Sequence, residues 1–447
     1  APLGEDTANP GNWGFQATML SSSNNTALPS SGHWGDSFET GASRVVLYEI
    51  PTLPLQSLAQ LQHVNNVTHY AQSPAYVIGN SYASPFIGPT ALSRTISASD
   101  VNGTKYYTQI DWSYLSNEAL WDEYFFSTLA PRQDLGLDDS NWSGIVNGFA
   151  DGTYELSNSR IKLITGVDAE DFASTVLTDP AGNTIAPDAY AQVAGSLYVD
   201  GAFNVNSTSV EAWKALLSAT NGVDVSHLNT SGSSIQTSTT SAGDSPFTRL
   251  GLPADGEGAD WAGYRELNER EIQDLAEAIV EQVKMRGPFV SLSDFVNRRL
   301  SNDSDDTGRM GALQAAIEDA GLNSGFSTTV NSSDLSQSNL TYTDHAMGPI
   351  ASGATGYLRQ SDLLQTIAPA LSARSDTFVI RAYGDSVSPL TGETVTAWCE
   401  AVVQRVPEYV NSGNTVDADT ASLNPTNAQY GRRFEIVAFR WLTDDQI

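Results

Sequence analysis

Residues 264–323 constrain the fold more than any other stretch, because helix start and stop signals follow one another there. Apolar residues recur every three to five positions over residues 264–286, which predicts one amphipathic helix. Lys284 and Arg286 suit the negative end of the helix dipole, and Gly287-Pro288 ends the helix. The apolar stripe consists of Leu267, Ile272, Leu275, Ile279 and Val283.

Two further helices are predicted directly after this one. Ser293 is the expected N-cap of a helix over residues 294–300, since serine accepts hydrogen bonds from free backbone N–H groups at a helix start. A polar turn over residues 301–308 leads to a third helix over residues 311–321. The segment is therefore predicted to be a compact group of three helices, and it contains no catalytic motif.

The C-terminal part is predicted to be β-rich. Residues 377–383, 394–406 and 434–442 combine β-branched and aromatic residues, and a turn is expected at Pro389–Gly392. Together they predict an antiparallel meander. With the helices clustered between strand regions, the predicted fold class is α+β, with antiparallel sheet regions and a clustered helical insert.

At 447 residues the chain is long for a single core, so a multi-domain organisation is expected. Helices are also predicted over residues 55–64, 116–126, 209–217 and 358–371, and strands over 44–50 and 106–111. Residues 138–200 are predicted to be loop-rich, and residues 229–246 to be a low-complexity exposed loop. The expected segments are an aromatic, loop-rich region 1–150, an α/β segment 151–250, a helical insert 251–375 and a β meander 376–447.

Charge excludes some partners. The chain has 52 acidic and 22 basic residues, a formal charge of −30, which argues against nucleic acid and against an anionic membrane surface. No run of residues is apolar enough to span a membrane. Tracts rich in Ser, Thr, Asn and Gly, with little lysine, predict a secreted, periplasmic or cell-surface protein. Ala1 and the residues after it lack a signal peptide's apolar segment, so such a segment is expected to have been removed or to lie upstream.

Cys399 is the single cysteine, which excludes an intrachain disulfide. Its neighbours alternate as in a strand, so we predict a buried structural thiol rather than a nucleophile.

A calcium site is one interpretation of Asp303, Asp305 and Asp306, whose carboxylates precede Gly308 as in a calcium loop. Gln314 stands where an EF-hand has its bidentate glutamate, which argues against that motif. The alternative is a solvated turn whose acidic residues favour the start of the next helix.

Two groups of residues suggest other functions. Residues 383–388 resemble the first block of GDS-type esterases, with Ser386 as nucleophile, but every histidine lies upstream of this serine, and a β-turn explains the motif better. Trp13, Trp34 and Trp121 could stack on sugars, although core packing is the commoner role of tryptophan. No metal-ligand spacing or phosphate-binding loop is present.

Several segments resemble the C-terminal part of the verrucomicrobial cassette protein A family. They are residues 74–82, residues 200–209 with Trp213, and residues 287–300 followed by 311–317. The helical insert followed by residues 378–382 and 434–441 is also similar to the large minor pseudopilin of type II secretion. These resemblances imply an exported protein with pilin-like partners and a pilin-type sheet carrying a helical insert. They supply no catalytic residues.

The sequence therefore predicts a non-enzymatic, exported structural component of a pilus-like or secretion-associated surface assembly. Its expected partners are itself or pilin-like subunits. The alternative is a secreted carbohydrate-binding or carbohydrate-processing protein.

Overall fold

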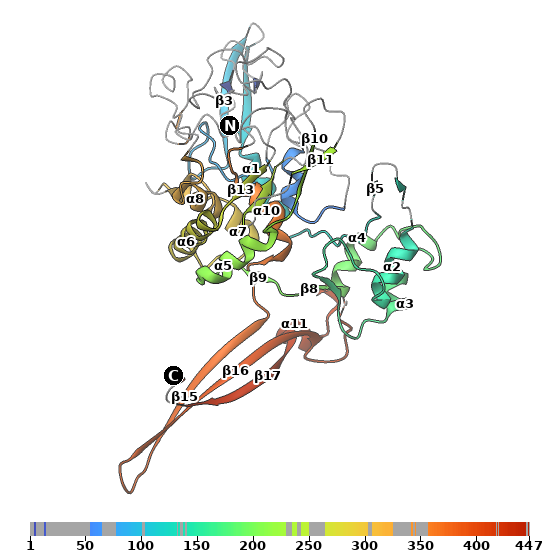
Figure 1. Cartoon of the computed structure of the whole chain (residues 1–447), viewed down its shortest axis with the longest axis vertical. Coiled ribbons are helices and arrows are strands. Elements are labelled where there is room, and N and C mark those ends of the chain that lie inside the picture. Colours follow the sequence, from blue (N-terminus) through green and yellow to red (C-terminus); the bar gives the residue numbers. More distant parts are fainter. Residues whose placement is uncertain are drawn as a thin grey trace. The chain divides into compact units, whose positions relative to one another are not determined.

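The structure is a computed structural model, and its elements are labelled in Figure 1. The chain folds into two compact units. Unit 1 comprises Ala1–Thr128, Arg132–Leu137 and Ala202–Ala373, and unit 2 comprises Leu129–Pro131, Asp138–Gly201 and Arg374–Ile447. The residues that the structure describes are 4–5, 13–14, 54–64, 77–100, 103–131, 133–134, 137–138, 141–228, 235–238, 243–249, 264–302, 306–324, 341–342, 345, 356–416, 418, 420–443 and 446.

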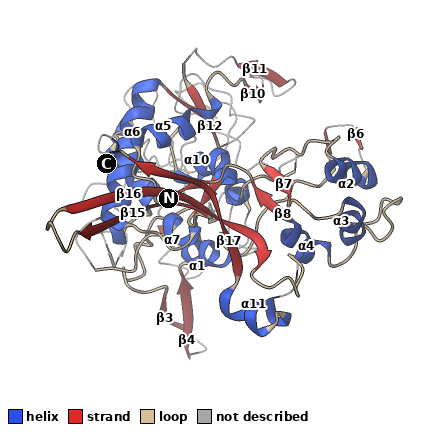
Figure 2. Ribbon diagram, turned by 90° about the horizontal axis from the view of Figure 1, so that it is seen from below, coloured by secondary structure: helices blue, strands red, loops and turns tan. Residues whose placement is uncertain are grey.

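Unit 1 is built around a group of helices, several of which lie together in Figure 2. They are η1 (Leu58–His63), α1 (Trp112–Leu120), α5 (Val210–Leu217), η3 (Ser218–Thr220), α6 (Glu269–Arg286), α7 (Leu292–Val296), η5 (Asp306–Gly308), α8 (Ala312–Asp319), α10 (Gln360–Ile367) and η9 (Ala368–Ala370).

Short strand pairs accompany these helices. The antiparallel pairs are β1 (Gly4–Glu5) with β2 (Trp13–Gly14), β3 (Ser93–Asp100) with β4 (Gly103–Ile110), β10 (Val225–Leu228) with β11 (Ile235–Ser238), and β12 (Ser245–Thr248) with β13 (Tyr264–Leu267). β9 (Phe203–Asn204) pairs in parallel with β14 (Leu371–Ser372). β5 (Gln133–Asp134) pairs with β6 (Leu137–Asp138).

α6 begins later than the sequence pattern predicts. Residues 264–267 form β13, and the helix starts after Asn268, whose side chain accepts hydrogen bonds from the backbone N–H groups of Arg270 and Glu271, both at 3.0 Å. The predicted start was wrong because Leu267 suits a helical stripe equally well, yet reaches the core from a strand. The predicted end is confirmed, with Gly287 as C-cap.

α7 is shorter than predicted and has a different cap. Ser291, not Ser293, caps it, with its Oγ accepting the Asp294 N–H at 3.1 Å. The two carboxylate oxygens of Asp122 accept the N–H groups of Leu292 at 2.7 Å and of Ser293 at 3.0 Å. This tertiary contact selects the start of the helix, and local sequence does not show it. The third helix of the group is confirmed as α8.

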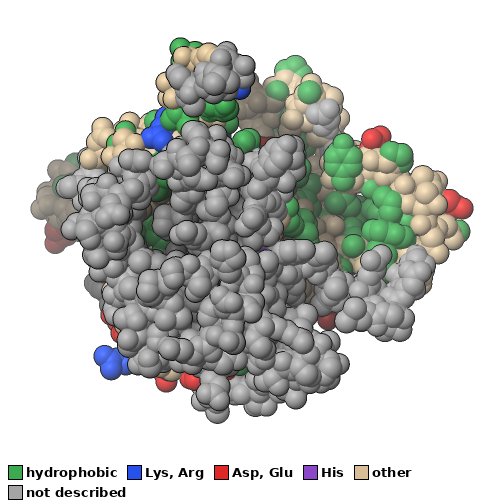
Figure 3. All heavy atoms as spheres, turned by 90° about the horizontal axis from the view of Figure 1, so that it is seen from above, with side chains coloured by type: hydrophobic (Ala, Val, Ile, Leu, Met, Phe, Trp, Pro, Cys, Tyr) green, Lys and Arg blue, Asp and Glu red, His purple; other side chains and the backbone are tan. Residues whose placement is uncertain are grey.

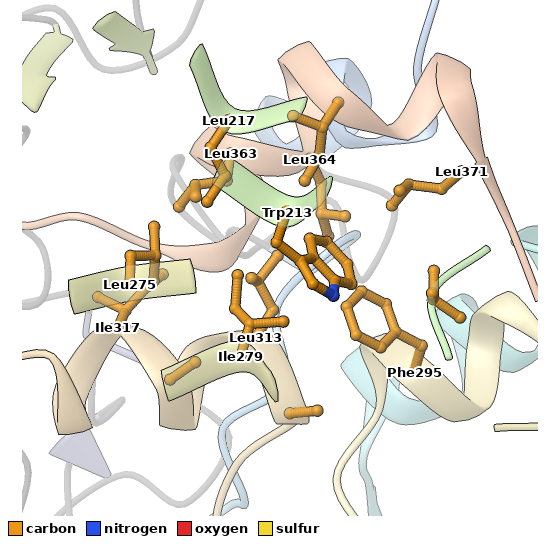
Figure 4. Packing of buried hydrophobic residues seen from close by; sticks show 14 of the residues in the cluster. Trp213, Leu217, Leu275, Ile279, Phe295, Leu313, Ile317, Leu363, Leu364 and Leu371 are labelled. Carbon is orange, nitrogen blue, oxygen red and sulfur yellow. The ribbon is translucent and has the colours of Figure 1, made fainter. Parts of the chain in front are cut away.

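The core of unit 1 lies among α5, α6, α7, α8 and α10 (Figure 4). Trp213 is fully buried, and its indole nitrogen donates to the Ser207 carbonyl at 2.8 Å. Its ring lies 4.7 Å from Phe203 and 6.1 Å from Phe295, measured between centroids. Burying an aliphatic or aromatic side chain of this kind contributes about 1.5–3 kcal/mol, so this cluster is the main source of stability in unit 1. Other members are Leu217, Leu275, Ile279, Leu313, Ile317, Leu363, Leu364 and Leu371.

Unit 1 encloses a buried ion pair. The guanidinium of Arg249, just after β12, donates to both carboxylate oxygens of Asp362 in α10, at 2.9 Å and 3.1 Å. Both side chains are buried, with 0% and 2% exposure. Gln62 of η1 donates to the same carboxylate at 3.4 Å. The ion pair thus ties three elements that are distant in sequence.

The first part of unit 2 is helical, which corrects the prediction of a loop-rich segment over residues 138–200. α2 ends at Gly152 in the left-handed conformation (φ 79°), and α3 begins at the N-cap Asp168. The helices are short and interrupted, so their periodicity was missed, but they enclose a core of their own. The elements are α2 (Trp142–Asp151), β7 (Ile161–Leu163), α3 (Ala169–Val176), α4 (Ala189–Gln192), η2 (Val193–Ser196) and β8 (Leu197–Val199).

The second part of unit 2 is a three-stranded antiparallel sheet in the order β15-β16-β17, which confirms the predicted meander (Figure 1). The fold class is α+β, as predicted. The elements are β15 (Thr377–Val387), β16 (Thr394–Tyr409), η10 (Thr420–Ser422), α11 (Pro425–Tyr430) and β17 (Arg432–Leu442). None of the described helices combines the length and the apolar character needed to cross a membrane.

The remaining predictions have mixed outcomes. The helix after Ser209 is confirmed as α5, and the strand over residues 106–111 as the end of β4. The helix over residues 116–126 lies earlier, at α1, and residues 229–246 include β11 and the start of β12 rather than loop alone. Residues 55–64 contain the shorter 3-10 helix η1, residues 358–371 contain α10 and η9, and residues 44–50 lie outside the described residues.

Candidate interaction surface

The C-terminal sheet has two faces whose composition follows from its register. Successive residues of a strand point to opposite faces, and residues directly opposite each other on neighbouring strands share a face. Glu400 lies opposite both Arg381 and Arg440, whereas Ala401 lies opposite Ile380 and Phe439. One face therefore carries charges, and we call it the charged face. The other carries Ile380 and Phe439, and we call it the apolar face.

Ions on the charged face are paired with one another. Glu400 Oε2 accepts the Arg381 Nε hydrogen at 2.8 Å, and Glu400 Oε1 accepts the Arg440 Nε hydrogen at 2.9 Å. Hydrogen bonds from the two guanidinium groups lower the pKa of Glu400 below its ordinary value. The rings of Tyr383 and Trp398 lie beside this row, 4.5 Å apart. These charges stabilise the sheet locally.

The apolar face has no charged side chain along the central strand from Val395 to Val403. Its one hydroxyl is that of Ser386, and the ion pair of Arg405 with Asp376 lies at its end, where Arg405 is opposite Phe434 (Arg405 Nε to Asp376 Oδ1 2.6 Å). The face consists of Phe378, Ile380, Ala382, Gly384 and Ser386 on β15, Val395, Ala397, Cys399, Ala401 and Val403 on β16, and Phe434, Ile436, Phe439 and Trp441 on β17.

Large side chains of this face are exposed. Ile436 is 67% exposed, Trp441 66% and Phe439 53%. Exposed apolar side chains are common on any protein, and green atoms are also visible on the face drawn in Figure 3. Here the exposed side chains are contiguous, because Phe439 and Trp441 contact each other at 5.4 Å between ring centroids. A contiguous apolar patch marks an interaction site.

On the apolar face, large side chains lie on β17 and small ones lie on the central part of β16. β17 carries a ridge of three aromatic residues and Ile436, whereas the central part of β16 carries only Ala397, Cys399 and Ala401. Strands lie about 4.8 Å apart, so a ridge and a shallow trough run side by side along the sheet. The shape suits a binding surface, and it holds no nucleophile paired with a base.

The predicted calcium residues are only partly described. Asp303 and Asp305 lie outside the described residues, and only the backbone of Asp306 is described, at the start of η5. Gln314 is buried in α8, where its side-chain oxygen accepts the Gln360 N–H at 2.9 Å, so it faces the core. Among the described residues no cluster of His, Cys, Asp or Glu could hold a metal ion. The calcium site stays a prediction.

Ser386 does not lie in a β-turn, which corrects the sequence interpretation. It belongs to β15 and pairs with Val395, because the strand continues four residues past Tyr383. The turn follows at the predicted place, where the Ser388 N–H donates to the Glu393 carbonyl at 2.8 Å.

Histidine positions add no support for a nucleophilic role of Ser386. In unit 1, His63 Nε2 lies 2.7 Å from the Arg249 carbonyl, and His345 Nδ1 lies 2.9 Å from the Ser84 carbonyl. Ser386 itself belongs to unit 2. The side chains of His33, His69 and His227 lie outside the described residues.

Of the two roles considered for Trp121, the structure supports core packing, because Trp121 is buried and donates to the Asn117 side chain at 3.1 Å. The prediction for Cys399 was wrong. Cys399 is partly exposed rather than buried, because no second layer covers its face of the sheet among the described residues. The side chains of Trp13 and Trp34 lie outside the described residues.

The apolar face was missed at the level of sequence, although a signal was present. Residues 378–380 and 436–439 are apolar at successive rather than alternate positions. Such runs are typical of strands covered on both faces. They predict covered strands, whereas the structure leaves these side chains exposed, and only the structure shows this difference.

Comparison of the chain with family models, with curated proteins and with solved structures finds no match. The resemblances to the cassette protein A family and to the large minor pseudopilin therefore stay predictions from sequence.

Proposed function

We propose that this chain is a non-enzymatic structural subunit of an exported, pilus-like or secretion-associated surface assembly, and that it docks through the apolar face. The observation that carries this proposal is the exposed ridge of β17, where Phe434, Ile436, Phe439 and Trp441 are each between 53% and 67% exposed.

The free energy available at this ridge contributes to association but does not suffice for it. Fully burying one such side chain contributes about 1.5–3 kcal/mol, so covering the exposed half contributes roughly 1 kcal/mol each. The ridge alone then supplies several kcal/mol. Association costs about 4–15 kcal/mol in lost rotational and translational freedom, so a stable complex needs the whole apolar face, not the ridge alone.

Charge supports the same role. The chain's formal charge is −30, which keeps its polar surface solvated and discourages nonspecific clustering. The strands β15, β16 and β17 together carry five arginines and four carboxylates, a formal balance of +1. An acidic subunit therefore meets less repulsion on this sheet than the formal charge of the whole chain implies.

The proposal is tested on protein taken from its natural source. Light scattering and negative-stain microscopy should find filaments or large regular particles. Cys399 then reports on the face directly, because it is the single cysteine and lies at the centre of the trough. Its alkylation should be at least ten-fold slower in the assembled material than in the separated chain. A monomer in native material, with Cys399 equally reactive in both, would overturn the proposal.

Exposed aromatic rings favour one second candidate, a carbohydrate-binding protein. Trp441 and Tyr383 are 66% and 50% exposed, and aromatic rings on a sheet can stack on sugar rings. Titration with oligosaccharides should then shift the tryptophan fluorescence, and Trp441→Ala should abolish the shift if the apolar face is the site. A glycan array without binding removes this candidate.

A further inference from the structure

We infer that the occupant of the apolar face is the same face of a second copy of this chain, in a two-fold symmetric pair. The inference rests on the proposed function, since it names the partner of the same surface. Three properties of the face support it: its shape, its size and its charge.

Shape makes the face complementary to itself. A two-fold axis parallel to the sheet can place the β17 ridge of one copy in the β16 trough of the other, and the reverse contact follows by symmetry. Phe439 and Trp441 then pack over the small residues Ala401 and Cys399 of the partner copy. Small residues opposite large ones let two sheets pack closely, at the usual separation of about 10 Å.

Size sets the expected strength of the pair. In this arrangement β16 and β17 of the two copies overlap, and two strands about 4.8 Å apart and about ten residues long, at about 3.3 Å per residue, cover roughly 320 Å² on each copy. Two copies together then bury roughly 640 Å², which is below the size of a stable specific interface and corresponds to a weak, transient pair. The pair should therefore dissociate on dilution rather than be permanent.

Charge predicts how the pair responds to salt. No ion lies on the central strand of the face between Val395 and Val403, so salt has no attractive ion pair to screen there. Two chains of charge −30 repel each other, and salt screens that repulsion. Raising the salt concentration should strengthen the pair. If the face instead bound a partner through that partner's positive charge, raising the salt concentration would release the partner.

Sedimentation of the purified chain over a range of concentrations is the central experiment. A monomer–dimer equilibrium is expected, shifted toward dimer by 0.5 M NaCl. Ile436→Asp should weaken it at least ten-fold, because it places a charge on the ridge. Val379→Asp is the matched control, since Val379 is 63% exposed but lies on the charged face, where it pairs with Val402. Circular dichroism should show both variants folded.

Alkylation of Cys399 reports on the geometry. Because Trp441 of the partner copy covers Cys399 in the pair, alkylation should slow as the protein concentration rises in the parent chain and in Val379→Asp, but not in Ile436→Asp. A chain that stays monomeric at every concentration, with or without salt, overturns the inference.

The same experiments separate this inference from the proposed function. If the purified chain is monomeric while Cys399 is protected in native assemblies, the face docks on a different subunit. The inference then fails and the proposed function stands. If Cys399 is unprotected in native material, the proposed function fails as well.

Discussion

Two tryptophans show how differently unit 1 and the C-terminal sheet of unit 2 use their apolar residues. Trp213 in the core of unit 1 is fully buried, whereas Trp441 in the C-terminal sheet is 66% exposed. Both belong to apolar clusters, and both contact another aromatic ring. Unit 1 buries its cluster within itself, whereas the sheet presents its cluster to solvent. The sheet is therefore the part of the molecule at which we propose that a partner binds.

Ion pairs show the same contrast, since unit 1 encloses buried pairs and those of the sheet lie on its surface. The Arg249–Asp362 pair is enclosed in unit 1, where an unpaired charge would be strongly unfavourable. In the sheet, Arg381, Glu400 and Arg440 form a row on the molecular surface. Unit 1 thus depends on its buried ions for stability, whereas the sheet depends little on its ions and exposes apolar groups instead. Four predictions test this comparison.

The largest effect is expected at the buried ion pair. Asp362→Ala leaves the Arg249 guanidinium buried without its counter-ion, which should lower the free energy of unfolding by about 3–5 kcal/mol. Glu269→Ala is the control, because Glu269 pairs with Lys214 at 3.1 Å but is 80% exposed. That change should lower the free energy of unfolding by less than about 1 kcal/mol, as measured by urea unfolding. Equal losses for both variants would contradict the distinction between buried and exposed ions.

The second largest effect is expected when a core side chain and a sheet side chain are truncated and their losses in the free energy of unfolding are compared. Leu313→Ala removes a fully buried side chain and should cost about 2–5 kcal/mol. Ile436→Ala removes a side chain that is 67% exposed, and in dilute protein it should cost less than about 0.5 kcal/mol. Urea unfolding monitored by circular dichroism measures both. A comparable loss at Ile436 in the monomer would show that the apolar face is already covered within the chain.

Acid should weaken unit 1 through His63. Burial, aided by the nearby Arg249 charge, lowers the pKa of His63, so the folded state binds fewer protons than the unfolded state as pH falls below the ordinary value of 6.5. This contribution to stability is present above pH 6.5 and is lost as pH falls. His63→Gln keeps an N–H donor for the Arg249 carbonyl but does not titrate. The parent chain should lose more stability than this variant between pH 7.5 and 5.5, and identical losses would contradict the assignment.

The smallest effect is expected at Glu400. Glu400→Gln removes the charge between two arginines that are each about half exposed, so the unfolding midpoint at pH 7 should change little. Since the two arginines lower the pKa of Glu400, its contribution is present above the ordinary carboxyl pKa and is lost as pH falls through the lowered value. The small difference from the parent chain should therefore vanish in acid. Dimerisation should be unchanged, because Glu400 lies on the charged face.

Local signals allowed part of the fold to be predicted. The end of α6 at Gly287 and the turn between β15 and β16 depend on residues that act within a few positions of themselves. The start of α7 could not be predicted, because Asp122 selects it from 170 residues away in sequence. The candidate surface lies on strands that were predicted correctly, yet its exposure was not predicted.

The sequence by itself determined the α+β fold class, the C-terminal meander and the strongly acidic charge, because periodicity and composition are local properties. Only the tertiary structure decided which apolar residues are covered. Covering depends on contacts between distant segments, such as the hydrogen bond from Ser57 to the Leu364 carbonyl across 307 positions. Alternation in a strand separates two faces of a sheet, but what lies against each face is decided by the rest of the chain or by a partner.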